Sequence, residues 1–159
     1  MGKKDEKTNV MRLLDAANVT YTEHHYEQDP TKTGEEIAAL LGENPAAVFK
    51  TLVTVGKSGK HYVFAVPVAG SLNLKKAASA AGEKYVEMIP QKALLPLTGY
   101  VHGGCSPLGM KKAFPTFFDK SVEAFDTVYF SAGKVGYQVE LKTEDLKRVL
   151  PFTVADVCE

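Results

Sequence analysis

The chain has 159 residues, with 19 basic and 19 acidic side chains, so its formal net charge is zero. This length is typical of one domain that folds without disulfides or metal, and residues 1–159 are therefore treated as a single domain. The charge balance argues against a protein that holds a long stretch of nucleic acid by charge alone. No DNA partner is expected, although a short contact with an RNA end is compatible with this balance.

The first half of the chain predicts helices and strands in irregular order, with capping residues and hydrophobic spacing marking the boundaries. The expected elements are a helix at 10–17 capped by Thr8 or Asn9, a strand at 20–26, a helix opened by Thr33 and Glu36 and ended by Gly42, a short helix at 45–49 after Asn44, and a hairpin of strands at 51–55 and 61–68.

The second half predicts several short strands and three further helices. The expected elements are a helix at 74–81 between Asn73 and Gly82, a strand at 85–88, a helix from Pro90 to Leu95 that Pro96 and Gly99 end, strands at 100–102, 114–118, 127–131 and 137–141, and a helix opened by Thr143 and ended by Pro151. Residues 132–136 are expected to join the last two strands as a glycine-rich turn.

Several of these strands are joined by short turns and must therefore run antiparallel, while helices separate the others. This pattern favours a single α+β domain with a mixed, strongly curved and partly barrel-like β-sheet flanked by helices. It argues against a doubly wound nucleotide-binding fold, which needs regular alternation of strand and helix. Neither a G-x-G-x-x-G nor a Walker A sequence occurs, and no cofactor is expected.

The cysteines and histidines show no metal-binding or disulfide pattern. Cys105 and Cys158 are far apart, which predicts two reduced thiols, and no C-x-x-C or H-x-x-x-H spacing occurs. The adjacent His24 and His25 would face opposite sides of a strand, so no metal site is expected. No apolar run reaches the length of a membrane span, and the charged N-terminus lacks the apolar region of a signal peptide. We therefore expect a cytoplasmic protein without a membrane partner.

Lys50 is the first candidate for chemistry. It lies within Val48–Leu52, where a helix is followed by a strand, and its apolar neighbours would hold its stem and direct its ammonium to the boundary. A cation in such a place suits a phosphate or a polarised carbonyl. The alternative is a surface lysine whose stem covers apolar neighbours.

The loop Gly103–Gly109 is the second candidate. Paired glycines permit unusual backbone angles, so several N–H groups can point to one anion, and Lys111 and Lys112 add positive charge. The alternative is an ordinary tight turn. A small platform for an RNA end could also form from lysines and aromatic residues, or these could be solvated surface groups: Lys75, Lys76, Lys111, Lys112, Lys134, Tyr26, Tyr100 and Phe114.

Cys105 invites comparison with a catalytic thiol. A cysteine nucleophile needs a histidine or a helix N-terminus to lower its pKa. His102 is three residues away, and His24, His25 and His61 are further candidates, but no pattern selects any of them. A plain packed or half-exposed thiol is therefore favoured over a nucleophile.

Several short motifs occur together in a specific order along nearly the whole chain, from Val10 to Asp156. They are Tyr26–Pro30, Val48–Leu52, Pro67–Gly70, Leu74–Lys76, Gly103–Gly109, Tyr129–Gly133 and Val139–Leu141. In this combination the sequence resembles the YbaK-type Cys-tRNA(Pro) deacylases of the YbaK/EbsC family. This family is related to the editing domain inserted in bacterial prolyl-tRNA synthetases.

The resemblance implies one editing domain over residues 1–159, an α+β fold, and hydrolysis of a mischarged tRNA ester without metal or cofactor. It places the essential lysine at Lys50 and a catalytic backbone position at Gly103. The substrate-binding positions that it implies are Tyr26, Thr33, Thr51, Gly104, Ser106, Pro107, Ser131 and Gln138.

Two of these positions depart from the family pattern. Gln138 stands where the family often has Asp, and Thr33 stands where it often has Phe. Both positions line the pocket in the resemblance, so they bear on rate or specificity. The preferred amino acid therefore stays open between cysteine and another small residue such as alanine.

A mechanistic hypothesis follows from the resemblance. A pocket built for proline discriminates against a similarly small apolar cysteine by only about 1–3 kcal/mol, so a separate editing site is expected. In the hypothesis, the thiol of the substrate itself attacks the ester carbonyl, while Lys50 and the N–H groups of Gly103 and Gly104 stabilise the developing charge. Tyr26 and Ser131 would shape the pocket and fix the amino group.

The expected partners are mischarged tRNA(Pro) and, because few phosphates can be neutralised, a complex with prolyl-tRNA synthetase. A monomer or weak homodimer is expected. Two other functions remain open at this point. One is a non-catalytic module that binds a nucleotide or a tRNA 3′ end, and the other is a hydrolase that uses Cys105.

Overall fold

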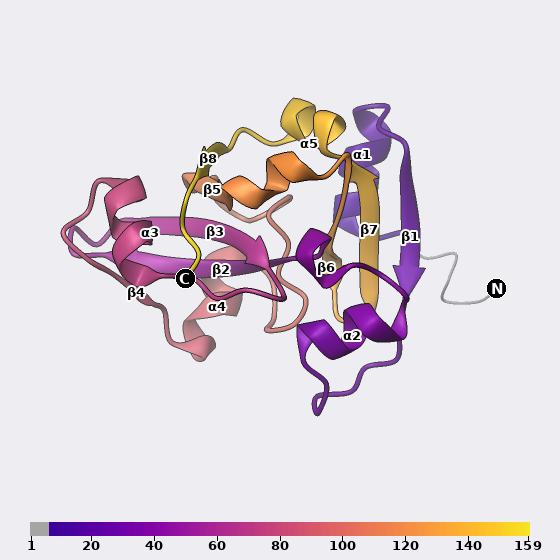
Figure 1. Cartoon of the computed structure of the whole chain (residues 1–159), viewed down its shortest axis with the longest axis horizontal. Coiled ribbons are helices and arrows are strands. Elements are labelled where there is room, and N and C mark those ends of the chain that lie inside the picture. The colour runs from indigo at the N-terminus through magenta and orange to yellow at the C-terminus, as the bar shows by residue number, and fades with distance from the viewer. Residues whose placement is uncertain (1–6) are drawn as a thin grey trace.

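The computed structural model describes residues 7–159, so the expectation that the N-terminus is not a signal peptide falls largely outside the described residues (Figure 1). The helices and strands are α1 (Asn9–Ala16), β1 (Tyr21–His25), α2 (Gly34–Leu40), η2 (Pro45–Ala47), β2 (Phe49–Gly56), β3 (His61–Pro67), α3 (Leu74–Ala81), β4 (Val86–Met88), α4 (Gln91–Thr98), β5 (Thr116–Asp119), η3 (Lys120–Ala124), β6 (Thr127–Lys134), β7 (Tyr137–Lys142), α5 (Thr143–Val149) and β8 (Thr153–Ala155).

The strands form two sheets with helices around them, and the expected α+β class is confirmed. The smaller sheet has the order β1-β7-β6 and is antiparallel, while the larger has the order β4-β2-β3-β5-β8 and includes the parallel pairs β3/β5 and β5/β8. A bridge between Val48 and Tyr129 joins the two. The expectation of one mixed sheet is therefore wrong, because strand partners are chosen by non-local contacts. Neither sheet closes, so the partly barrel-like shape is not confirmed.

The helix starts follow the capping residues that the sequence predicts. Thr8 caps α1 through Met11 N, and Thr33 and Glu36 form the full capping box of α2. Asn44 and Asn73 cap η2 and α3 through Ala46 N and Lys76 N. Each side-chain oxygen satisfies a backbone N–H that has no partner in the first turn, which is why these boundaries are readable from local sequence.

Three predictions in the second half of the chain are wrong, one of a strand and two of helix ends. Residues 100–102 form no strand, because the Tyr100 hydroxyl donates to the carbonyl of Leu108 and ties the segment into a loop. Pro96 lies inside α4, where it removes one hydrogen bond of a two-turn helix that Thr98 supports by donating to Leu94 O at 2.8 Å. Lys142 is the N-cap of α5, and the Thr143 hydroxyl donates instead to Phe125 O at 2.6 Å.

The β6–β7 hairpin is longer than predicted. β6 continues to Lys134, with an irregular register between Ser131 and Lys134, and a tight turn at Val135–Gly136 replaces the expected 132–136 connection. Gly136 has a φ of 89°, and a Cβ there would lie 2.8 Å from the carbonyl oxygen of Tyr26. Only glycine fits both demands, and the close approach holds the end of β1 against this turn. The short elements η3 and β8 were not predicted.

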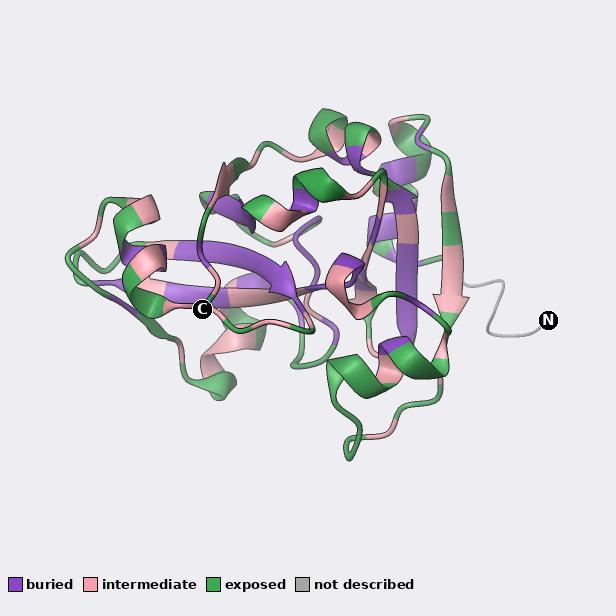
Figure 2. Ribbon diagram, in the orientation of Figure 1, coloured by how far each residue is buried: buried purple, intermediate pink, exposed green. Residues whose placement is uncertain are grey.

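The main core lies between α1, the two sheets and α5, while a second cluster lies between α3 and the larger sheet (Figure 2). Along β7, Val139 and Leu141 face this core, with exposed fractions of 0% and 2%. Since side chains alternate along a strand, Gln138 and Glu140 face the other side, against which the segment after α2 packs through the bridge of Val48 to Tyr129. That second face of the small sheet carries one wall of the site described below.

Candidate functional site

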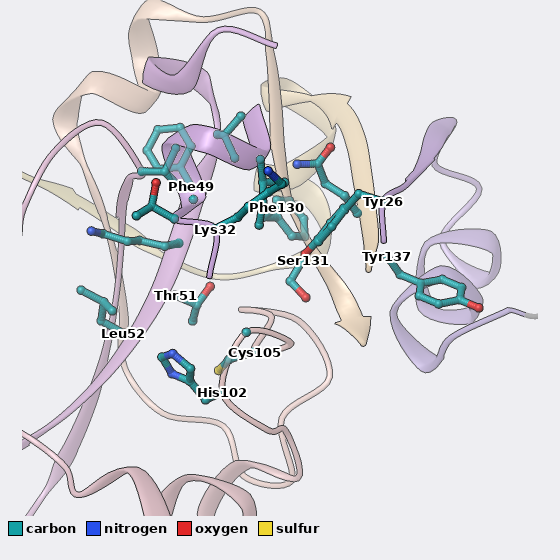
Figure 3. Close-up of a pocket in the computed structure, with 18 of the residues that line it drawn as sticks. Tyr26, Lys32, Phe49, Thr51, Leu52, His102, Cys105, Phe130, Ser131 and Tyr137 are labelled. Atoms are coloured by element: carbon teal, nitrogen blue, oxygen red, sulfur yellow. The ribbon is translucent and has the colours of Figure 1, made fainter. Parts of the chain in front are cut away.

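A cavity of about 370 Å³ opens between the start of β2, the beginning of α2, the loop at 102–105 and the small sheet (Figure 3). Its size is suited to a small ligand such as an amino acid with part of a ribose. The structure brings seven of the predicted site residues together in its walls: Tyr26, Thr33, Lys50, Thr51, Gly103, Ser131 and Gln138.

Lys50 and Thr51 come from the start of β2, directly after η2. Lys50 is half-buried, and the backbone on either side of it is fixed by the ladder to β3, where it pairs with Val66. No carboxylate of the described residues forms an ion pair with it. The Thr51 Oγ1 atom is buried and has no hydrogen-bond partner among these residues. β2 therefore contributes a cation and an unsatisfied hydroxyl to the cavity wall.

Tyr26 lies directly after β1, and its backbone N–H donates to Gly136 O at 3.0 Å. Burial raises the pKa of its phenol, and the nearby Glu43 carboxyl raises it further, while a hydrogen bond from Gly136 opposes this. The phenol therefore keeps its proton at neutral pH. It can donate a hydrogen bond to a ligand in the cavity.

Gln138 and Ser131 are register partners on β7 and β6, and His24 of β1 pairs with Gln138 from the other side. Cross-strand partners share a face, so these side chains form a row of which Ser131 and Gln138 reach the cavity. Ser131 Oγ accepts from Gly133 N at 3.0 Å, whereas the Gln138 side-chain oxygen is buried without a partner among the described residues. The row thus presents polar atoms to a ligand.

The predicted glycine loop divides between the cavity and its support. Gly103 lines the cavity with a φ of 86°, whereas a Cβ on Gly104 would lie 3.0 Å from Val135 N, so Gly104 packs against the β6–β7 turn. Ser106 is fully buried and accepts from Leu108 N at 3.3 Å. Pro107 lines a separate hollow near α5. Gly104, Ser106 and Pro107 are therefore not brought into the cavity walls.

Cys105 also lines the cavity, beside His102 (Figure 3). Burial raises the pKa of its thiol to about 12, and no hydrogen bond joins it to His102 within the part of the chain that the structure describes. A thiol in this state is protonated at neutral pH and is a weak nucleophile. The geometry therefore supports a packed thiol rather than a cysteine-dependent hydrolase.

The predicted lysine platform does not assemble at the cavity. Lys76 on α3 donates to Asp156 and to Cys158 O, and Lys111 donates to Pro96 O. The Lys134 ammonium lies over the ring of Tyr137, 4.9 Å from its centroid, and Tyr137 does line the cavity. Of the aromatic residues in the predicted platform, Tyr26 is the member in the cavity wall.

Sequence reasoning missed the apolar half of the wall and one cation. The additional lining residues are Lys32, Gly34, Ile37, Val48, Phe49, Leu52, Val68, Leu94, His102, Phe130 and Tyr137. Their hydrophobic spacing predicts burial but not which elements meet, so no local signal could have gathered them. Only Lys32 had a local signal for its place in the site, because it directly precedes Thr33, a predicted site residue.

Thr33 has a structural task that the sequence also predicts. Its Oγ1 accepts from Glu36 N at 3.2 Å and caps α2. We expect Thr33→Ala to lower the free energy of unfolding by about 1 kcal/mol and Tm by about 2–4 °C, because one first-turn N–H loses its partner. Thermal unfolding would measure this, with Thr33→Ser as the control that keeps the cap. An unchanged Tm together with a loss of activity would point to a ligand contact instead.

Within the described residues, no three His, Cys, Asp or Glu side chains are grouped so that they could hold a metal ion. In the same range, no helix has the length and apolar character needed to cross a membrane.

A model of the aminoacyl-tRNA editing domain matches residues 28–149, which include every residue of the cavity except Tyr26. The chain belongs to this family. The resemblance noted in the sequence, and with it the class of aminoacyl-tRNA editing proteins, is confirmed.

Relatives of this editing domain agree. The Enterococcus faecalis protein "Putative Cys-tRNA(Pro)/Cys-tRNA(Cys) deacylase EbsC" is 42% identical over 143 residues, covering 89% of this chain and 87% of EbsC. Among solved structures, the hypothetical protein APE2540 is 28% identical with a TM-score of 0.85, covering 96% of this chain and 100% of its own. A "putative trans-editing enzyme for prolyl tRNA synthetase" is 24% identical with a TM-score of 0.79, covering 97% and 99%, and shows the shared fold.

Proposed function

We propose that the protein is a trans-editing deacylase that hydrolyses mischarged Cys-tRNA(Pro). The observation that carries this proposal is the cavity, where Lys50, Thr51, Gly103, Ser131 and Gln138 converge from four separate segments. The 42% identity to EbsC, whose name specifies Cys-tRNA(Pro) and Cys-tRNA(Cys), supports the choice of substrate. The volume of about 370 Å³ suits a small aminoacyl group attached to a ribose.

The proposed reaction uses the thiol of the substrate. Its sulfur forms a bond to the ester carbonyl carbon, the bond from that carbon to the ribose oxygen breaks, and the thiol proton passes through water to the departing oxygen. The product is free tRNA and a cyclic thiolactone, which water later opens to cysteine. The protein supplies position and charge stabilisation rather than a nucleophile, in agreement with the protonated state of Cys105.

Each wall of the cavity has a role in this proposal. The Lys50 ammonium and the backbone at Gly103 face the carbonyl and ribose end, where negative charge develops. Tyr26, Ser131 and Gln138 present hydrogen-bonding groups to the amino end, and Thr51 completes the polar wall. Gly104, Ser106 and Pro107 act indirectly by holding the loop, and Thr33 acts through α2.

The proposed partners follow from charge. With a net charge of zero, the chain can neutralise few phosphates and should bind free tRNA weakly. We therefore propose that mischarged tRNA(Pro) reaches it in a complex with prolyl-tRNA synthetase in the cytoplasm, with the editing domain itself a monomer or weak homodimer.

The test is hydrolysis of labelled Cys-tRNA(Pro), Ala-tRNA(Pro) and Cys-tRNA(Cys) side by side. Selective loss of cysteine from tRNA(Pro) is the expected result. Hydrolysis of both cysteinyl esters would show specificity for cysteine but not for tRNA(Pro). Hydrolysis of the alanyl ester alone would show that the preferred amino acid is alanine. Binding of tRNA without turnover of any ester would show a non-catalytic binding module instead.

A further inference from the structure

Glu43 is a buried carboxylic acid that none of the roles above uses. It is the third residue after the end of α2, and its exposed fraction is 8%. Glu43 N donates to Ala38 O at 2.9 Å, and Gly42 N donates to Ala39 O at 3.1 Å, with a φ of 72° at Gly42. This is the Schellman ending of a helix, in which the residue after the glycine usually makes an apolar contact. Here that inward-facing position holds a carboxyl group.

The surroundings of Glu43 are rich in acceptors. Both of its side-chain oxygens and the side-chain oxygen of Gln138 are buried, and none of the three has a hydrogen-bond partner among residues 7–159. A buried acceptor without a donor is destabilising, so three such oxygens close together need a physical reason. A ligand that donates to the Gln138 oxygen, with the Gln138 amide nitrogen donating to Glu43, would supply it.

Gln138 connects Glu43 to the cavity. Gln138 lines the cavity and Glu43 does not. The Gln138 amide lies close enough to Glu43 to lower its pKa, although no hydrogen bond of normal geometry joins the two side chains. The amide nitrogen can donate to Glu43 while the amide oxygen accepts from a ligand. In this way Glu43 can orient and polarise the Gln138 side chain so that its oxygen is a stronger acceptor in the cavity.

We propose that Glu43 is a positioning residue for the amino group of the substrate, because it holds the Gln138 amide with its oxygen toward the cavity. The inference rests on the proposed function, since it takes the ligand to be an aminoacyl ester with a free ammonium. An ammonium has three donors and a positive charge, which matches a cluster of acceptors beside a carboxylate. Gln138 itself carries no charge, and Glu43 supplies a negative charge from a different segment of the chain.

The titration of Glu43 gives the inference a pH signature. Burial raises the pKa of Glu43, the Gln138 amide and His24 lower it, and Glu140 raises it. Tyr26 and Tyr129 also face it, since Glu43 raises the pKa of both phenols. Because an ammonium favours the ionised carboxylate, substrate binding should lower this pKa. The kcat/KM for an ammonium substrate should rise with pH as Glu43 ionises.

Stability should change in the opposite direction. A carboxyl group with a raised pKa binds its proton more tightly in the folded state, so stability falls as pH rises through that pKa. Glu43→Leu removes the unpaired carboxyl and restores the usual apolar contact at this helix end. We expect its Tm to exceed that of the wild type at mildly alkaline pH, with a smaller difference in acid. If Glu43 had only a structural role, its replacement by leucine would instead lower both the stability and the activity of the protein.

The test compares two esters that differ in the amino group alone. Cysteinyl-tRNA(Pro) and 3-mercaptopropionyl-tRNA(Pro) both carry a thiol and an ester, but the second has no ammonium. We expect Glu43→Leu to reduce the preference for the cysteinyl ester by about 10- to 100-fold, with Glu43→Gln intermediate because it keeps an acceptor but loses the charge. Glu140→Gln is the matched control, because Glu140 lies on the same sheet face but bonds His24 at 2.7 Å. Its preference should stay within about twofold of the wild type, since a solvent-screened, partly exposed pair contributes little.

A second measurement separates the inference from the proposed function. The pKa of Glu43 can be followed by carbon-13 NMR with L-cysteine methyl ester or with methyl 3-mercaptopropionate added to the full chain. A lower pKa with the first ester alone supports the inference even if neither tRNA ester is hydrolysed, which would be a failure of the proposed function. Active wild-type protein with an unchanged preference in Glu43→Leu, or an unchanged Glu43 pKa with both esters, would overturn the inference.

Discussion

Replacing Lys50 with alanine is expected to reduce kcat/KM for Cys-tRNA(Pro) by about 10²- to 10³-fold, the effect of removing one preorganised group that stabilises a developing oxyanion. Lys50 is held by the β2–β3 ladder at the cavity, and no carboxylate of the described residues neutralises it. Its charge is therefore available to the ester carbonyl or the adjacent ribose. Single-turnover hydrolysis of labelled Cys-tRNA(Pro) measures the loss.

The same strand pair offers a matched control. Lys60 is exposed at the far end of the β2–β3 hairpin, so Lys60→Ala removes one positive charge without touching the cavity. Its kcat/KM should stay within about twofold of the wild type, because one surface lysine contributes little at moderate salt. Lys50→Arg keeps the charge but changes its shape and should be intermediate. Deacylation that survives Lys50→Ala, in protein with an unchanged Tm, would contradict the role proposed for Lys50 and would also rule out a non-catalytic binding module.

The elements that could be predicted from sequence are those whose ends are fixed by neighbours in the chain. Thr33 and Glu36 satisfy each other's backbone groups within one turn, and Asn73 does the same at the start of α3. The failures are non-local. Tyr100 has the composition of a strand residue, yet its hydroxyl bonds Leu108 O in the loop. The short strands β5 and β8 pair although they are far apart in the sequence. The residues next to each strand therefore could not reveal its partner.

The candidate site shows the same division. Lys50 and Gly103 were predicted from unusual residues in unusual places, a lysine between apolar neighbours and paired glycines in a loop, and both line the cavity. Glu43 was missed because a glutamate after a helix-ending glycine is normally on the surface. Its burial arises because the segment after α2 packs against the small sheet, which places Glu43 beside Gln138 of β7. This contact joins residues that are far apart in the sequence, so it could not be predicted from the residues around Glu43.

Exchanging the thiol of the substrate should have a larger effect than removing a thiol of the protein. Ser-tRNA(Pro) has a hydroxyl where Cys-tRNA(Pro) has a thiol, and a hydroxyl without a base is a far weaker nucleophile. We expect the serine ester to be hydrolysed at least about 100-fold more slowly, because in the proposed mechanism the protein supplies no nucleophile to replace the lost thiol. Parallel single-turnover assays of the two esters measure the ratio.

The complementary variant is Cys105→Ser, which should keep the rate with Cys-tRNA(Pro) within about threefold of the wild type. Burial raises the pKa of Cys105 to about 12, and burial together with Asp119 raises that of Cys158 to about 12, so neither thiol is ionised at neutral pH. Since thiolates react and thiols do not, brief alkylation of the protein should also leave activity intact. A large loss in Cys105→Ser, with equal rates for the serine and cysteine esters, would move the nucleophile from the substrate to the protein.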